Sequence, residues 1–139
     1  MVTIAKYISD FINTHLSGVD IETNHLEDGA DKYGLFKSPS RSVVEHTDGS
    51  YTITEHYQFF ARQAGISEVD RKDSDEFLEE LTYWVDDYPF SYEYPEIDGG
   101  RRITQITLTG CPYPLEVESS NEVVYQIALS ITYDRERSI

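Results

Sequence analysis

The apolar residues of the chain follow two periods, one typical of helices and one typical of strands. At the start of the chain they recur every three or four positions, which predicts a helix over Val2–Ser17 that ends at Gly18. Polar residues such as Asp10 and Asn13 fill the other side of this helix. Its apolar side, which we expect to face the core, consists of Ile4, Ile8, Phe11, Ile12 and Leu16.

A second helical pattern lies in the middle of the chain. We expect this helix to begin near Asp73, because Asp73 and Glu76 stand at capping-box spacing and early acidic residues complement the positive end of a helix. Apolar positions continue to Tyr88, and Pro89 is expected to end the helix there. The apolar side of this helix consists of Phe77, Leu78, Leu81, Trp84 and Val85.

Most of the remaining sequence alternates between apolar and polar residues, which predicts strands. The alternation is strict from Tyr51 to Phe59, just after the hairpin signal Asp48-Gly49, and clearest from Val123 to Tyr133. The predicted strands are Val19–Leu26, Tyr33–Lys37, Ser42–His46, a strand that starts at Tyr51 and stops at Gly65, Ile103–Thr109, Tyr113–Glu118 and Val123–Asp134; Pro89–Gly100 is predicted to be a loop.

This order of elements predicts a single domain over residues 1–139 with an α+β fold. Short turns between consecutive strands require antiparallel pairing, because a parallel crossover needs a dozen or more residues. We therefore expect an antiparallel or mixed sheet with two helices packed on it, in the order α-β-β-β-α-β-β-β. With 39% hydrophobic and 13% aromatic residues, the composition is that of an ordinary globular domain.

The net charge of −15 is concentrated in one segment. The window from Gln63 to Gly100 holds 12 of the 26 acidic residues and two basic ones, Arg71 and Lys72, so it carries −10. A field of this sign opposes the binding of nucleic acid through phosphate neutralisation, and we expect no sequence-specific binding. The outward face of the second helix could line a DNA channel, meet a neighbouring subunit or simply keep the protein in solution.

The basic residues suggest a complementary surface. Arg101 and Arg102, together with Arg135 and Arg137, flank the last part of the predicted sheet and could lie close together in space. In a self-assembling protein, an acidic helix opposite a basic spot would bring the acidic edge of one copy against the basic edge of the next. Ordinary scattered surface charge is the simpler interpretation.

The histidines and acidic residues do not form a pattern typical of a metal site. His46 and His56 lie on strands joined by a tight turn, but a zinc site needs a third ligand and preferably a fourth. His15 and His25 have no partner that the sequence identifies. The acidic residues at the start of the second helix lack the spacing and the central glycine of an EF-hand loop; these residues are Asp70, Asp73, Asp75 and Glu76.

Signatures of catalysis are also missing. Cys111 is the one cysteine, and its place between Gly110 and Pro112 favours a small turn residue over a catalytic thiol. The sequence has no Gly-x-Ser-x-Gly motif, and Gly99-Gly100 is not a phosphate-binding loop. We therefore expect no enzymatic activity, no catalytic residues, no metal and no cofactor. We also expect no membrane association, because no apolar run reaches the length of a signal peptide or a membrane span.

Four blocks of the sequence resemble a known family. The blocks are Tyr57-Gln58-Phe59-Phe60-Ala61-Arg62, Phe77-Leu78-Glu79-Glu80-Leu81-Thr82-Tyr83-Trp84-Val85, Gln105-Ile106-Thr107-Leu108-Thr109 and Tyr125-Gln126-Ile127-Ala128-Leu129-Ser130-Ile131. In these blocks, and in the order of its elements, the chain resembles the tail terminator or tail-completion proteins of long-tailed phages, also described as minor capsid proteins. The resemblance spans nearly the whole chain.

The resemblance implies a structural protein of the virion, assembled in the host cytoplasm. Proteins of this family form a homo-oligomeric ring, typically a hexamer, that caps the tail tube, stops its polymerisation and offers a docking surface to the head. The implied partners are further copies of the chain, the tail tube and the head–tail connector. The family has no catalytic residues to transfer to this sequence, and no interface residue can be assigned by motif.

The acidic window also favours a second function. A small acidic module could mimic DNA and occupy the groove of a basic protein, as a binding partner or an inhibitor. Such a module would depend on its exposed carboxylates, whereas a ring-forming protein would tolerate their loss unless they lie in its subunit contacts. The residues that distinguish the two functions are Asp73, Asp75, Glu79 and Glu80.

Overall fold

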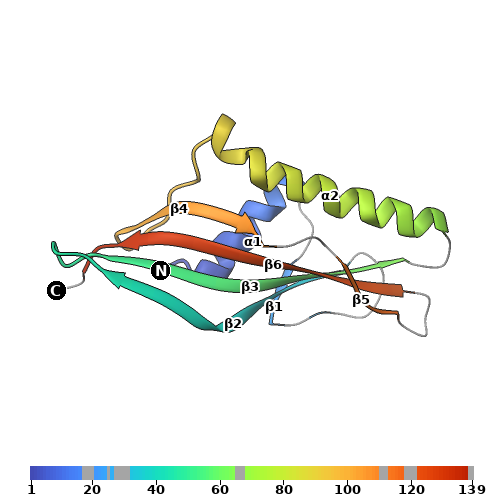
Figure 1. Ribbon diagram of the computed structural model, residues 1–139, viewed down its shortest axis with the longest axis horizontal. Helices are drawn as coiled ribbons and strands as arrows, with labels where there is room; N and C mark the ends of the chain where they lie inside the picture. Colours follow the sequence, from blue (N-terminus) through green and yellow to red (C-terminus); the bar gives the residue numbers. More distant parts are fainter. Residues whose placement is uncertain are drawn as a thin grey trace.

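The computed structural model of the chain describes residues 1–16, 21–24, 26, 32–64, 68–109, 113–117 and 122–137 (Figure 1). It has the α+β fold that the sequence predicts, with two helices and a mixed sheet. In chain order the elements are α1 (Ile4–Leu16), β1 (Ile21–Thr23), β2 (Lys32–Glu45), β3 (Tyr51–Ala64), α2 (Glu68–Ser91), β4 (Arg101–Leu108), β5 (Tyr113–Val117) and β6 (Glu122–Arg135).

The sheet is built around the pairing of β3 with β6. Its strand order is β1-β2-β3-β6-β4, and β5 pairs with the other part of β6. β1 runs parallel to β2, whereas every other pair is antiparallel. β3 and β6 are paired without a register shift from Tyr51, opposite Arg135, to Ala64, opposite Glu122. The position of β2 is therefore set by its pairing with β3, and the position of β4 by its pairing with β6.

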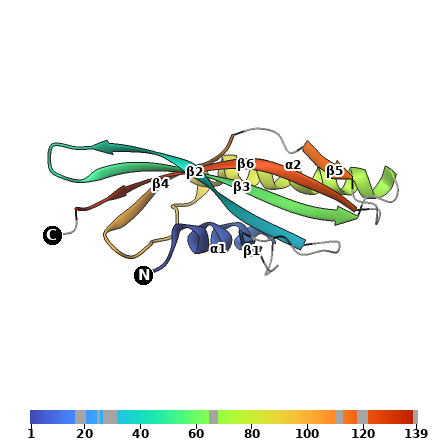
Figure 2. The ribbon, with the colours of Figure 1, turned by 90° about the horizontal axis from the view of Figure 1, so that it is seen from below.

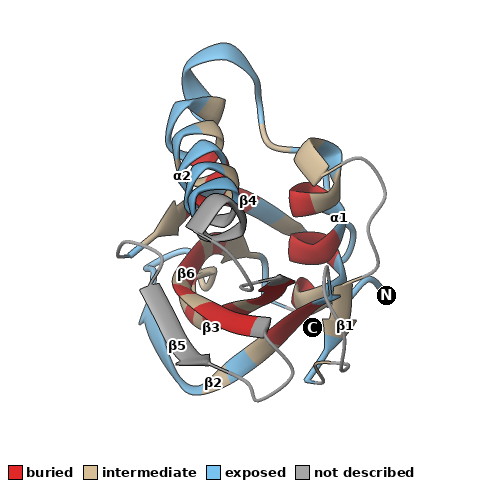
Figure 3. Cartoon of the chain, turned by 90° about the vertical axis from the view of Figure 1, so that its right-hand side faces the viewer, coloured by how far each residue is buried: buried red, intermediate tan, exposed pale blue. Residues whose placement is uncertain are grey.

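Both helices lie on one side of the sheet, and the core fills the space between them and the strands (Figure 3). Alternate residues of β3, such as Tyr57 and Phe59, are almost completely buried on this side. Leu81 and Val85 of α2 close the core from one direction and Ile8 of α1 from the other. The predicted inward face of β6 is confirmed, since all of its members are buried: Val123, Tyr125, Ile127, Leu129, Ile131 and Tyr133.

The structure corrects the prediction for β2. The sequence predicts two short strands separated by Ser38-Pro39-Ser40, but Lys32–Glu45 is one strand with a register shift between Lys37 and Arg41. Pro39 is tolerated because this part of β2 is an edge, where a missing N–H removes no ladder hydrogen bond on the outer side. β1 is shorter than predicted and covers only Tyr33–Leu35 of that edge.

The ends of α2 also differ from the prediction. The helix begins at Glu68, so Asp73 is not its capping residue, and it continues past Pro89 to Ser91. Pro89 stands in the last turn, where its missing N–H leaves only the carbonyl of Val85 without a helical partner. The backbone N–H of Tyr92 still donates to the carbonyl of Tyr88 over 2.9 Å. The polar residues before Asp73 extend the helix without adding to its apolar periodicity, so the sequence pattern could not reveal them.

Replacement of Leu81 tests the packing of α2 on the sheet. Because Leu81 is almost fully buried, we expect Leu81→Ala to lower the free energy of unfolding by about 2–5 kcal/mol. The neighbouring Glu80 is exposed, and Glu80→Ala should change it by no more than about 0.5 kcal/mol. Urea denaturation of both variants measures the difference. Equal effects of the two substitutions would contradict the packing described here.

Candidate interaction surfaces

The outward side of α2 is a strongly acidic surface. It carries exposed carboxylates along its whole described length, namely Asp73, Asp75, Glu76, Glu79, Glu80, Asp86 and Asp87. The acidic residues from Asp70 to Glu76 all lie within this helix, where the backbone cannot form the turn of a calcium loop. Among the residues that the structure describes, no group of three His, Cys, Asp or Glu side chains is placed to hold a metal ion.

The last turns of α2 add exposed aromatic side chains to this acidic surface. Tyr83 is 56% exposed and Phe90 is 88% exposed. Asp86 and Asp87 lie between them, at the spacing that places all four residues on one side of a helix. Exposed aromatic residues are enriched where proteins bind one another, so this stripe is a candidate contact surface.

The outer edge of β2 is a second candidate surface. β1 covers this edge at Tyr33–Leu35 only, and no other described strand pairs with it from Lys37 to Glu45. Val43 is 45% exposed and Val44 is 56% exposed. Figure 2 shows that β2 and β3 continue as a hairpin past the end of α1. Arg41 is exposed on the same segment, and the ion pairs of the described residues do not include it, although its charge acts on the hydroxyl of Tyr133.

The arginines that flank the last part of the sheet come together, as the sequence suggests. Arg101 of β4 and Arg135 of β6 are cross-strand partners. Tyr51 of β3 pairs with Arg135 on its other side, so all three residues lie at the same end of the sheet. The guanidinium groups of Arg135 and Arg137 lie over the ring of Tyr51, at 5.0 and 4.9 Å from its centre.

Acidic neighbours compensate much of this positive charge. Arg101 pairs with Asp98 over 2.7 Å, and Arg137 pairs with Glu45. Arg102 stands opposite Asp134 across the two strands. These arginines therefore connect the strands at this end of the sheet, and they do not form the basic spot that was one of the two interpretations of the sequence.

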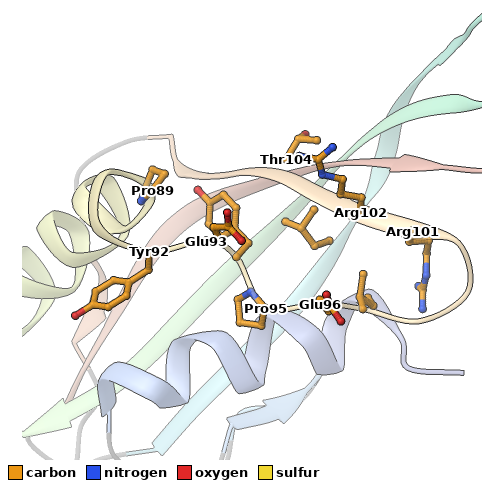
Figure 4. Close-up of a pocket in the computed structure, with 11 residues that line it drawn as sticks. Pro89, Tyr92, Glu93, Pro95, Glu96, Arg101, Arg102 and Thr104 are labelled. Atoms are coloured by element: carbon orange, nitrogen blue, oxygen red, sulfur yellow. The ribbon is translucent and has the colours of Figure 1, made fainter.

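A cavity of about 600 Å³ lies between β4 and the loop that follows α2 (Figure 4). The hydroxyl of Tyr7 donates to the carbonyl of Pro95 over 2.7 Å, and the N–H of Ile106 donates to the hydroxyl of Tyr94 over 3.2 Å. These bonds fix the loop against α1 and β4. Glu93 and Arg102 give the cavity wall acidic and basic groups, and Pro89 at the end of α2 and Pro95 of the loop give it apolar surface.

Glu55 is a buried carboxylate outside the candidate residues that the sequence indicates. It is 4% exposed on the inward side of β3, between residues that are almost all apolar. The ammonium of Lys37 lies 3.1 Å from one of its oxygens, and the hydroxyl of Tyr57 donates to the same oxygen over 3.1 Å. The hydroxyl of Tyr133 donates to the other oxygen. A glutamate at an inward position of an alternating strand is the sequence signal that could have revealed this cluster.

The partners of Glu55 determine its ionisation. Burial raises the pKa of Glu55, but the hydrogen bonds from Tyr133 and Lys37 and the charge of Lys37 outweigh burial and hold the pKa below its ordinary value. Burial and the neighbouring Glu55 carboxylate raise the pKa of both Tyr57 and Tyr133 above the ordinary range of tyrosine. The cluster is therefore one carboxylate held by two neutral hydroxyls and an ammonium. It joins β2, β3 and β6, and it is a structural feature of the core.

The histidines lie in separate places. His46 bonds the hydroxyl of Thr52 over 2.6 Å, and His56 bonds the hydroxyl of Ser130 over 2.8 Å, on the side of the sheet that faces away from the helices. His15 stacks on Trp84 with 5.1 Å between ring centres. His25 and Cys111 lie outside the described residues.

Within the described part of the chain, no helix is both long and apolar enough to cross a membrane.

The lowered pKa of Glu55 predicts a contribution to stability that depends on pH. This contribution is fully present above the ordinary glutamate pKa of 4.5 and is lost as the pH falls through the folded-state pKa. We expect Glu55→Gln to lower the free energy of unfolding by about 1–3 kcal/mol at neutral pH. The difference between wild type and variant should shrink as the pH falls below 4.5.

Urea denaturation over a series of pH values measures this difference. Asp48 and Asp98, which have lowered pKa values because they accept hydrogen bonds from Ser50 and Arg101, are unchanged in the variant. The comparison of the two proteins therefore isolates Glu55. A difference that stays constant down to the lowest pH would show that the carboxylate of Glu55 is not stabilised by these partners.

Compared with models of known protein families and with curated protein sequences, the chain gives no match.

Proposed function

We propose that this chain is a structural protein of a phage virion. It acts as a tail terminator or tail-completion protein and forms a homo-oligomeric ring that caps the tail tube and joins it to the head. Its partners are other copies of itself, the tail tube and the head–tail connector. It has no catalytic function.

The observation that carries this proposal is the place of the four resembling blocks in the fold. Tyr57–Arg62 lies in β3 and Tyr125–Ile131 lies in β6, where the two strands pair directly. Gln105–Thr109 covers the second half of β4 on the other side of β6, and Phe77–Val85 is the part of α2 that packs on these strands. Blocks that are far apart in the sequence thus form one continuous centre, which supports a common fold over a chance likeness of separate segments.

The distribution of charge supports the same proposal. A protein that surrounds a DNA channel must let the DNA pass without holding it. The net charge of −15 and the exposed carboxylates of α2 repel a polyanion. The aromatic and aliphatic side chains that stay exposed on α2 and β2 supply surface for contacts with other protein chains.

Assembly of the purified chain tests the proposed function. We expect sedimentation velocity to show a closed oligomer, six copies by the resemblance, and negative-stain electron microscopy to show rings with a central hole. The chain should also be present in purified phage particles at the junction of head and tail. A strict monomer, both in solution and with isolated tail tubes, that is absent from phage particles would refute the proposal.

The exposed acidic side of α2 favours one other function, a small acidic binding or inhibitory module that mimics DNA. In that case, replacing Asp73, Asp75, Glu79 and Glu80 together by Asn or Gln should abolish binding to a basic partner protein. All four residues are exposed, so thermal unfolding should be little changed. The tail protein proposed above should instead keep its ring in the same variant, which sedimentation and electron microscopy would show.

A further inference from the structure

We propose that the ring is held by a contact between α2 of one copy and β2 of the next. The contact joins the outward stripe of α2, defined as Tyr83, Asp86, Asp87 and Phe90, to the free edge of β2, defined as Arg41, Val43 and Val44. This inference rests on the ring assembly proposed above and names the two surfaces that form it. The occupant of each surface is a second copy of the chain.

The outward stripe of α2 lies on the side of the helix opposite its buried residues. Leu78, Leu81 and Val85 face the sheet. Tyr83 and Phe90 are two helical turns apart, and Asp86 and Asp87 lie midway between them. Phe90 is among the most exposed apolar side chains in the described part of the chain, although its neighbours Tyr88 and Tyr94 pack together. Phe90 is therefore left exposed to solvent, whereas the aromatic rings on either side of it in the sequence pack against each other.

The free edge of β2 matches this stripe in chemistry. Val43, on the same face of β2 as Arg41, gives exposed aliphatic surface for Tyr83 and Phe90, and Val44 adds aliphatic surface from the other face of the strand. The ion pairs of the described residues do not include Arg41, Asp86 or Asp87. The ammonium of Lys37, which is 56% exposed although it pairs with Glu55, adds positive charge to this edge. Acidic and aromatic groups on one surface therefore meet basic and aliphatic groups on the other.

The two surfaces also match in length. From Tyr83 to Phe90 the helix rises about 10 Å, at about 1.5 Å per residue. From Arg41 to Val44 the strand rises about 10 Å, at about 3.3 Å per residue. Pro39 and the register shift before Arg41 interrupt the outer edge of β2, which hinders the addition of a strand from another chain. The side chains of this edge are therefore what a partner would contact.

The positions of the surfaces lead to a ring. α2 and β2 lie on opposite sides of the molecule, in the views of both Figure 1 and Figure 3. A contact between two unlike surfaces on opposite sides adds copies head to tail, and it closes into a ring when the rotation between copies closes. A two-fold dimer would use the same surface on both chains, which this contact does not.

Charge reversal tests the contact on the full-length chain. We expect Arg41→Glu alone, and Asp86→Lys with Asp87→Lys, each to weaken self-association by about tenfold or more, measured by sedimentation equilibrium. A one-to-one mixture of these two variants should associate as the wild type does, because each altered surface then meets a complementary one. The three substitutions combined in one chain should restore association for the same reason.

Two further variants serve as controls for this experiment. Asp73→Lys with Asp75→Lys makes the same charge change on the same helix but outside the stripe, and it should leave association unchanged. Phe90→Ala should weaken association by about tenfold or more. Its thermal unfolding, measured at a concentration at which both proteins are monomeric, should remain that of the wild type, because Phe90 is already exposed in the single chain.

The results separate this inference from the proposed function. Rings that persist in every charge-reversal variant, or no recovery of association in the mixture, would overturn the contact and leave the ring function standing. Open filaments that dissolve in the single variants and return in the mixture would support the contact and contradict the ring. A wild-type chain that remains monomeric at all concentrations would overturn both.

Discussion

Fourteen residues of β3 pair with fourteen residues of β6 in one unbroken register, and the rest of the structure depends on this pairing. A slip of one residue would turn every inward side chain of a strand to the opposite face. The register therefore decides which side of the sheet is apolar enough to bind α1 and α2. It also positions β2 and β4, because each pairs with one of these two strands.

Glu55 lies within this pairing and connects it to β2, which forms an edge of the sheet. The carboxylate holds Lys37 of β2 and Tyr133 of β6, so a single buried group connects three neighbouring strands. Lys37 stands just before the register shift of β2, and Arg41 follows that shift directly opposite Glu55. The cluster thus anchors β2 at the point where the strand leaves the core and becomes exposed. The free edge that we propose as a subunit contact is held in place by this buried charge.

The sequence pattern predicts the structure correctly where the structure depends on neighbours in the chain. The inward residues of β6 and the apolar side of α2 follow from spacing alone, and all are buried or packed against the core. It fails where distant groups decide the outcome. Pro39 and Pro89 look like boundaries in the sequence, but one lies at a sheet edge and the other in the last turn of a helix, where a missing N–H costs little. The candidate surfaces were also predicted only in part. The sequence locates the acidic charge, but it does not show that Phe90, Val43 and Val44 are exposed.

Periodicity and charge are properties of consecutive residues, so the sequence alone specifies the class of the fold, the inward faces of its main elements and the position of its acidic charge. The partners that hold the Glu55 carboxylate are brought to it only by the pairing of distant strands, since Tyr133 is 78 residues away. The tertiary structure also decided which apolar residues remain exposed and that α2 and β2 lie on opposite sides of the molecule. These features depend on which segments pack together, and the free energy of packing is set by contacts that no local pattern contains.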